Sequence, residues 1–126
     1  MARILLAEDD MSVREFVLRA LEADGHTVLL AHDGGEAAQA LGQAGARFDL
    51  LLADVRMPVM DGIALALAAS RDHPDLPILL MTGFADQRER AYGLDALVRE
   101  VLAKPFTLDG LLAAVRRALG APGPRP

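Results

Sequence analysis

The 126-residue chain contains no cysteine. This absence excludes disulfide bonds, thiolate chemistry and zinc sites with thiolate ligands, and it fits a reducing cytoplasm. Aromatic residues make up only 4% of the chain, so leucine, alanine, valine and isoleucine must fill the core. The net charge is −5 and no basic cluster is present, which disfavours binding to nucleic acid.

Long apolar runs are also missing. The N-terminal segment MARILLAEDD has a short apolar run before three acidic residues, too short for a signal peptide or a membrane span. We therefore predict a cytoplasmic protein that does not enter a membrane. With 52% hydrophobic and 25% charged residues, the chain has the composition and length of one globular domain.

Short apolar runs alternate with amphipathic segments along the chain. The runs lie at residues 4–7, 28–31, 50–53, 78–81 and 101–103, and each has the length of a strand covered on both faces of a parallel sheet. Apolar residues at helical spacing predict one helix with Phe16 and Leu21 in the core. They predict a second helix at residues 108–119 with Leu111 in the core. Weaker helical segments lie at 36–41, 63–71 and 87–92. This βα alternation predicts an α/β fold with helices on both faces of a parallel sheet.

Several predictions concern the ends of these elements. Ser12 followed by Glu15 predicts a capping box, and Gly25 a helix end. The three histidines, His26, His32 and His73, are too scattered for a metal cluster and are predicted at the surface. We expect one domain at residues 1–120, a disordered proline-rich tail at residues 121–126, and a complete chain.

Polar residues follow four of the five predicted strands. Ligands of open α/β sheets bind at the carboxyl ends of the strands, so these side chains should meet at one edge. They are Glu8, Asp9 and Asp10 after the first run, Asp54 after the third, Thr82 after the fourth and Lys104 after the fifth. Lys104 is the only lysine among the 13 basic residues of the chain.

This combination of side chains suits phosphoryl transfer. Acidic groups held together repel one another unless a cation lies among them, and Mg²⁺ prefers carboxylate oxygens. Lysine and hydroxyl groups neutralise or bind phosphoryl oxygens, and an aspartate can itself carry the phosphoryl group as an acyl phosphate. Each residue taken alone is more often a cap, loop or surface residue, but the set together favours the functional interpretation.

The order Glu8-Asp9, Asp54, Thr82, Lys104-Pro105, with MPVMDG after Asp54, resembles the CheY-like receiver domain of two-component response regulators. The resemblance implies a flavodoxin-like (βα)5 fold with strand order 2-1-3-4-5. It further implies that Asp54 is the phosphoacceptor, that Thr82 and Lys104 bind phosphoryl oxygens, and that Mg²⁺ is bound by Glu8, Asp9, Asp54 and the backbone carbonyl of Arg56. Asp10 is excluded from the metal ligands, and the Lys104–Pro105 bond is expected to be cis.

The resemblance also implies partners. A sensor histidine kinase or a histidine phosphotransfer protein would phosphorylate the domain, which would then bind an output protein through the helix at 87–92, the strand at 101–103 and the helix at 108–119. No separate substrate turnover is expected. EDD after ILLA, the TGFA segment and a valine ahead of AKPF resemble CpdR-like regulators, single-domain adaptors for a ClpXP-type protease. A chemotaxis-type motor regulator is the alternative.

One position departs from the family pattern. Many receivers have an aromatic residue three positions before the lysine, where this chain has Val101, so the usual coupling of the threonine to an aromatic ring cannot operate.

A small phosphatase of the haloacid dehalogenase kind is disfavoured because Arg56 stands where a second aspartate is needed. A scaffold that is never phosphorylated is disfavoured because the acidic pair, Asp54, Thr82 and Lys104 are intact.

Overall fold

The structure, a computed structural model, describes residues 2–43, 45, 47–83, 93–94 and 96–120. These residues form the strands β1 (Arg3–Ala7), β2 (Thr27–Ala31), β3 (Leu50–Asp54), β4 (Ile78–Thr82) and β5 (Glu100–Ala103), and the helices α1 (Met11–Ala23), α2 (Gly34–Gly42), α3 (Gly62–Asp72) and α5 (Leu108–Gly120). The helix predicted at 87–92 and the tail predicted at 121–126 lie outside the described residues. No helix among the described residues has the length and apolar character needed to span a membrane.

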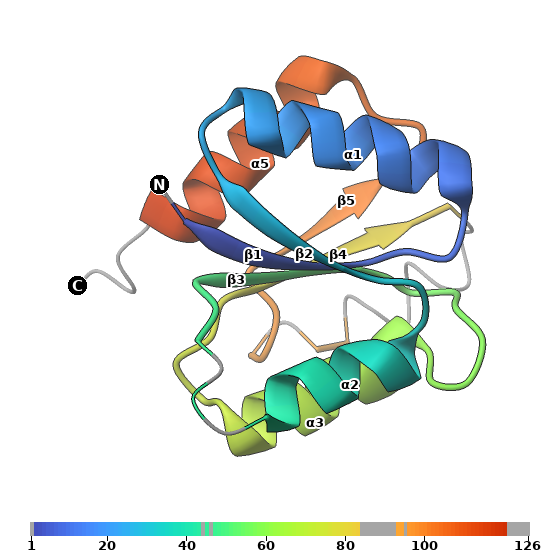
Figure 1. The fold of residues 1–126 in the computed structure, drawn as a ribbon, viewed down its shortest axis with the longest axis vertical. Helices are drawn as coiled ribbons and strands as arrows, with labels where there is room; N and C mark the ends of the chain where they lie inside the picture. Colours follow the sequence, from blue (N-terminus) through green and yellow to red (C-terminus); the bar gives the residue numbers. More distant parts are fainter. Residues whose placement is uncertain (1, 44, 46, 84–92, 95, 121–126) are drawn as a thin grey trace.

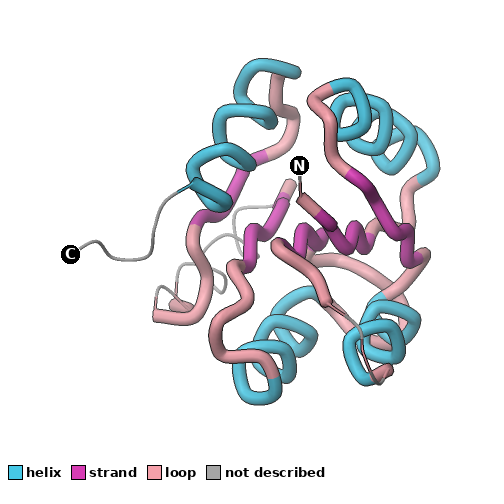
Figure 2. Tube along the Cα trace, turned by 60° about the vertical axis from the view of Figure 1, so that its left-hand side comes forward, coloured by secondary structure: helices cyan, strands magenta, loops and turns pink. Residues whose placement is uncertain are grey.

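The strands form one parallel sheet in the order β2-β1-β3-β4-β5. Helices α1 and α5 cover one face of this sheet, and α2 and α3 cover the other (Figure 1). The tube view shows the same arrangement, with the strands as a layer between the helices (Figure 2). The predicted doubly wound fold and its strand order are thus confirmed.

Alternate residues of the central strands point to opposite faces of the sheet and build two cores. Leu5, Leu51 and Leu80 belong to the core under α2 and α3, whereas Leu6 and Leu52 belong to the core under α1 and α5. Strands β1, β3 and β4 are covered on both faces, as predicted. Strands β2 and β5 are not, because they lie at the two edges of the sheet: Leu29 of β2 is 45% exposed, and the residues of β5 are all only partly buried.

Helix α1 begins differently from the prediction. The Asp10 side chain is its N-cap and accepts hydrogen bonds from the backbone N–H groups of Ser12 and Val13, at 2.8 and 3.2 Å. The capping box predicted at Ser12 is therefore wrong. The prediction that Phe16 is core is also wrong, since Phe16 is 42% exposed and packs at the rim against Phe106, with ring centroids 6.3 Å apart.

The surface prediction for His26 is wrong as well. Gly25, with a φ of 94°, ends α1 as expected. The chain then reverses, and the Thr27 N–H donates to the carbonyl of Ala2, just before β1, at 2.9 Å. This turn leaves the His26 side chain only 10% exposed, and its Nδ1 accepts a hydrogen bond of 3.2 Å from the backbone N–H of Ala2. His32 is exposed and contacts Glu36, as a surface histidine would.

Candidate functional site

The sheet itself brings the predicted site residues together. Asp54 and Thr82 are the last residues of β3 and β4, whereas Glu8 and Lys104 directly follow β1 and β5. Backbone hydrogen bonds continue beyond the strands, from Glu8 N–H to the Ala31 carbonyl at 3.1 Å and from Lys104 N–H to the Thr82 carbonyl at 2.8 Å. These bonds hold the backbone of Glu8 and Lys104 at the edge of the sheet.

Three carboxylates meet at this edge. Glu8, Asp9 and Asp54 each offer an oxygen, and these oxygens all lie within 4.8 Å of one another. Glu8 and Asp54 are buried, whereas Asp9 is exposed to solvent. Asp10 is the N-cap of α1 and is not one of these three carboxylates.

Lys104 lies between the two buried carboxylates. Its Nζ is 2.8 Å from Oδ2 of Asp54 and 3.2 Å from Oε1 of Glu8. The Lys104–Pro105 bond is cis, as the family resemblance predicted. Burial alone would lower the pKa of the ammonium group, but the hydrogen bond to Asp54 and the charges of both acids outweigh burial and raise that pKa. Lys104 therefore stays protonated near neutral pH.

Glu8 has an unusual environment for a carboxylate. Burial is the main cause that raises its pKa from 4.5 to about 7; the Asp10 backbone N–H, at 3.0 Å, opposes this rise, and the charge of Asp54 adds to it. The cluster thus holds three carboxylates, and one ammonium group contacts the two buried ones. Because the donors are all oxygens and carry excess negative charge, they fit a hard divalent cation such as Mg²⁺.

Of the two remaining predicted residues, Thr82 follows Met81, the register partner of Asp54 in the sheet, and Arg56 lies two residues after Asp54 in the chain. Thr82 is fully buried at the end of β4. Arg56 has an exposed side chain, and its backbone belongs to the loop that leaves Asp54. A hydrogen bond of 2.7 Å from the Gly62 N–H to the Val55 carbonyl closes this loop at the start of α3.

Arg14 contacts the loop that carries Glu8 and Asp9, and the sequence did not predict this contact. Its Nη1 donates to the backbone carbonyl of Glu8 at 3.1 Å and, at 3.4 Å, to that of Asp9. These bonds fix the backbone that carries both acids. An arginine in the first turn of an amphipathic helix looks like an ordinary solvated residue, so the sequence offers no signal that distinguishes it.

Comparisons with known proteins agree on one family. The profile of the response regulator receiver domain matches residues 4–116. Response regulator MprA of Mycobacterium ulcerans (strain Agy99) is 44% identical over 117 residues, which cover 93% of this chain and 50% of that protein. MprA of Mycobacterium tuberculosis (strain ATCC 25618 / H37Rv) matches with the same identity and coverage. The chain thus spans about half the length of the curated relatives it matches.

Solved structures give the same result. A CheY-like receiver domain protein from Methanospirillum hungatei JF-1 superposes with a TM-score of 0.86 at 26% identity, covering 96% of this chain and 95% of that one. Response regulator TrrA from Thermotoga maritima, solved in complex with Mg²⁺-BeF, has a TM-score of 0.84 at 27% identity and coverages of 94% and 100%. Chemotaxis protein CheY4 of Vibrio cholerae has a TM-score of 0.82 at 33% identity, with coverages of 94% and 99%.

Proposed function

Because the chain belongs to the response regulator receiver family of two-component systems, we propose that it is switched by Mg²⁺-dependent phosphorylation of Asp54. The observation that carries this proposal is the 2.8 Å contact between Asp54 Oδ2 and Lys104 Nζ, next to the carboxylates of Glu8 and Asp9. In this arrangement a nucleophile, a fixed cation and oxygen ligands for a metal share one sheet edge.

The metal ligands we propose are Glu8, Asp9, Asp54 and the backbone carbonyl of Arg56. Receiver domains bind Mg²⁺ at an acidic pocket, and the related TrrA was solved with Mg²⁺-BeF. When bound, Mg²⁺ supplies positive charge that neutralises the phosphoryl oxygens. Metal binding favours ionised Glu8 and relieves the repulsion among the three acids.

Phosphorylation proceeds by attack of an Asp54 carboxylate oxygen on the phosphorus of a phosphohistidine. The new P–O bond makes an acyl phosphate, and the P–N bond breaks and returns the imidazole of the donor. Lys104 then binds a phosphoryl oxygen in place of the free carboxylate, and the Thr82 hydroxyl donates to another. Because Lys104 is held between Asp54 and Glu8 beforehand, little reorganisation is required during the transfer.

The partners we propose are a sensor histidine kinase or a histidine phosphotransfer protein as donor, and an output protein that distinguishes the two states of Asp54. The adaptor role for a protease and the chemotaxis-type role, both suggested by the sequence, stay predictions about that output protein. A pull-down with phosphorylated and unphosphorylated protein tests them. A protease component enriched by one state alone supports the adaptor role, and a motor component supports the alternative.

Labelling with radioactive acetyl phosphate tests the proposed switch. We expect the wild-type protein to take up label, and Asp54→Asn to lose it. Asp49→Asn is the matched control, because Asp49 is an exposed acid just before β3, at the opposite end of the strand. Undiminished labelling of Asp54→Asn would exclude Asp54 as the phosphoacceptor.

A further inference from the structure

The loop that leaves Asp54 contains a strained residue. Val59 has a φ of 72°, a conformation that β-branched residues rarely adopt, and its side chain is 83% exposed. The backbone N–H of Met60 donates to the Pro58 carbonyl at 2.8 Å, so Val59 is the centre of a three-residue turn of the strained kind. Such a conformation persists only where the surrounding structure holds it in place.

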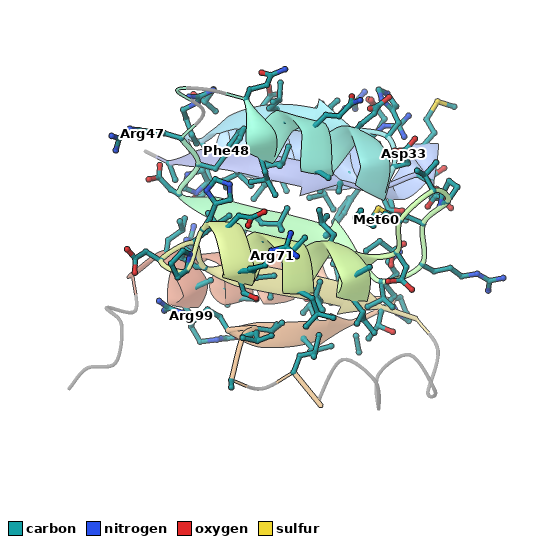
Figure 3. All side chains as sticks on the ribbon, turned by 90° about the horizontal axis from the view of Figure 1, so that it is seen from below. Asp33, Arg47, Phe48, Met60, Arg71 and Arg99 are labelled. Carbon is teal, nitrogen blue, oxygen red and sulfur yellow. The ribbon has the colours of Figure 1, made fainter. Side chains whose placement is uncertain are left out.

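The first turn of α2 lies directly against this strained turn. A Cβ atom on Gly34 would overlap the backbone carbonyl oxygen of Met60, and a Cβ on Gly35 would lie 2.8 Å from Cγ1 of Val59. Asp33, the N-cap of α2, and Met60 lie at the same end of the molecule, far from Arg47 and Phe48 (Figure 3). Helix and loop approach this closely because Gly34 and Gly35 have no side chains.

Gly62, at the other end of this loop, packs closely against the end of β3. A Cβ on Gly62 would overlap the backbone carbonyl oxygen of Asp54, and the Gly62 N–H is bonded to Val55 at the start of the loop. The segment from Asp54 to Gly62 is therefore confined between the end of β3 and the start of α2. Arg56, whose carbonyl is a proposed metal ligand, lies within this confined segment.

We propose that Gly34 and Gly35 are positioning residues of the phosphorylation site. The first turn of α2 supports the strained turn at Val59 from outside and thereby sets the backbone position of Arg56. This inference rests on the proposed function of the Arg56 carbonyl. Mg²⁺ requires close to ideal octahedral geometry, so a displacement of a few tenths of an ångström in one ligand weakens binding.

Alanine at Gly34 tests this inference, with alanine at Gly42 as the matched control. Gly42 belongs to the same helix, and a Cβ there would have no atom within 4 Å. We expect Gly34→Ala to weaken Mg²⁺ binding, measured by titration calorimetry, by roughly 10–100-fold, as is typical when a residue that supports a metal ligand is altered. Gly42→Ala should keep the wild-type affinity. Wild-type affinity in a folded Gly34→Ala protein would overturn the proposal.

A second pair of variants covers the case in which Gly34→Ala does not fold. At Gly35 the added methyl group would lie 2.8 Å from Cγ1 of Val59, a contact that Val59→Gly removes, and 3.2 Å from Oδ1 of Asp33, a contact that is the same in both backgrounds. We expect Gly35→Ala to weaken Mg²⁺ binding in the wild-type background and to have a much smaller effect in the Val59→Gly background, where only the contact with Asp33 is left. An equal loss of affinity in both backgrounds would mean that the contact with Val59 does not transmit the effect, and the proposal would be wrong.

Two further measurements separate failure of this inference from failure of the proposed function. If Asp9→Asn leaves Mg²⁺ affinity unchanged, the proposed metal site itself is wrong. If Asp9→Asn abolishes binding and Asp54 takes the label, but Gly34→Ala or Gly35→Ala binds Mg²⁺ normally, only the positioning role of α2 is wrong. A purely structural role of the glycines would lower stability without changing the Mg²⁺ affinity of the folded protein.

Discussion

At the scale of single residues, Glu8 has the most unusual environment in the site. It has no exposed surface, lies beside a second buried acid, and contacts the ammonium group of Lys104 at 3.2 Å. The position of Glu8 after an apolar run allowed the sequence to predict an acid at the sheet edge. The raised pKa could not be predicted, because it depends on burial by elements distant in the chain.

The raised pKa of Glu8 predicts how the stability of the metal-free protein depends on pH. Because this pKa rises from 4.5 in the unfolded chain to about 7 in the folded protein, the folded state holds a proton that the unfolded state releases between these values. This contribution to stability is therefore present at low pH and is lost as the pH rises from 4.5 to about 7. Glu8→Gln should remove it.

Denaturant unfolding in the presence of EDTA measures this effect. The difference in unfolding free energy between Glu8→Gln and wild type should grow in favour of the variant as the pH rises through that range. Glu36→Gln, at an exposed acid whose pKa is lowered mainly by the backbone N–H of His32, should not show this trend. A difference between Glu8→Gln and wild type that is constant with pH would contradict the assignment.

Single elements show which features of a fold a sequence encodes locally. The period of the apolar residues predicted α5 at 108–119, and the structure has Leu108–Gly120. Burial of the central strands was predicted from their continuous apolar runs. The exposure of Leu29 in β2 was not, because an apolar run does not reveal whether its strand lies in the centre or at the edge of the sheet.

The start of α1 is a second feature that the sequence alone did not determine. Asp10 and Ser12 are both good N-cap residues, and the choice between them depends on where β1 ends and how the loop holding Glu8 and Asp9 turns. The environments of Phe16 and His26 likewise depend on packing between distant segments. The set of acids and the lysine was predictable because strand order and parallel direction alone place the strand ends together.

The N-cap of α1 supplies the prediction at the scale of elements. Asp10→Ala should lower the free energy of unfolding by about 1 kcal/mol, since two backbone N–H groups lose their acceptor. Asp10→Asn keeps the accepting oxygen and should lose only a few tenths of that amount, and Ser12→Ala should have little effect. Chemical denaturation in EDTA compares the three, and a larger loss for Ser12→Ala than for Asp10→Ala would contradict the N-cap assignment.

At the scale of the whole molecule, the site joins distant parts of the sheet. The acids come from β1 and β3, and Lys104 comes from β5, so any ligand of this cluster binds the folded state alone. Mg²⁺ should therefore stabilise the protein by about 2.7 kcal/mol at a concentration 100 times its dissociation constant. Thermal unfolding with and without Mg²⁺ measures this gain.

Asp9→Asn should abolish the stabilisation by Mg²⁺ and raise the stability of the metal-free protein, because one of the three neighbouring charges is removed. Asp33→Asn is a suitable control, since Asp33 caps α2 and its amide form keeps the accepting oxygen. An increase in thermal stability with Mg²⁺ that persists in Asp9→Asn would place the metal elsewhere.

The central claim is that Asp54 carries the phosphoryl group with the help of Mg²⁺. The most direct measurement is peptide mass spectrometry after phosphorylation by acetyl phosphate and trapping of the acyl phosphate with borohydride, which converts the modified aspartate to homoserine. We predict homoserine at residue 54 in the presence of Mg²⁺ and a large decrease when EDTA is present. Homoserine at another acid, or equal modification of residue 54 with EDTA, would contradict the account.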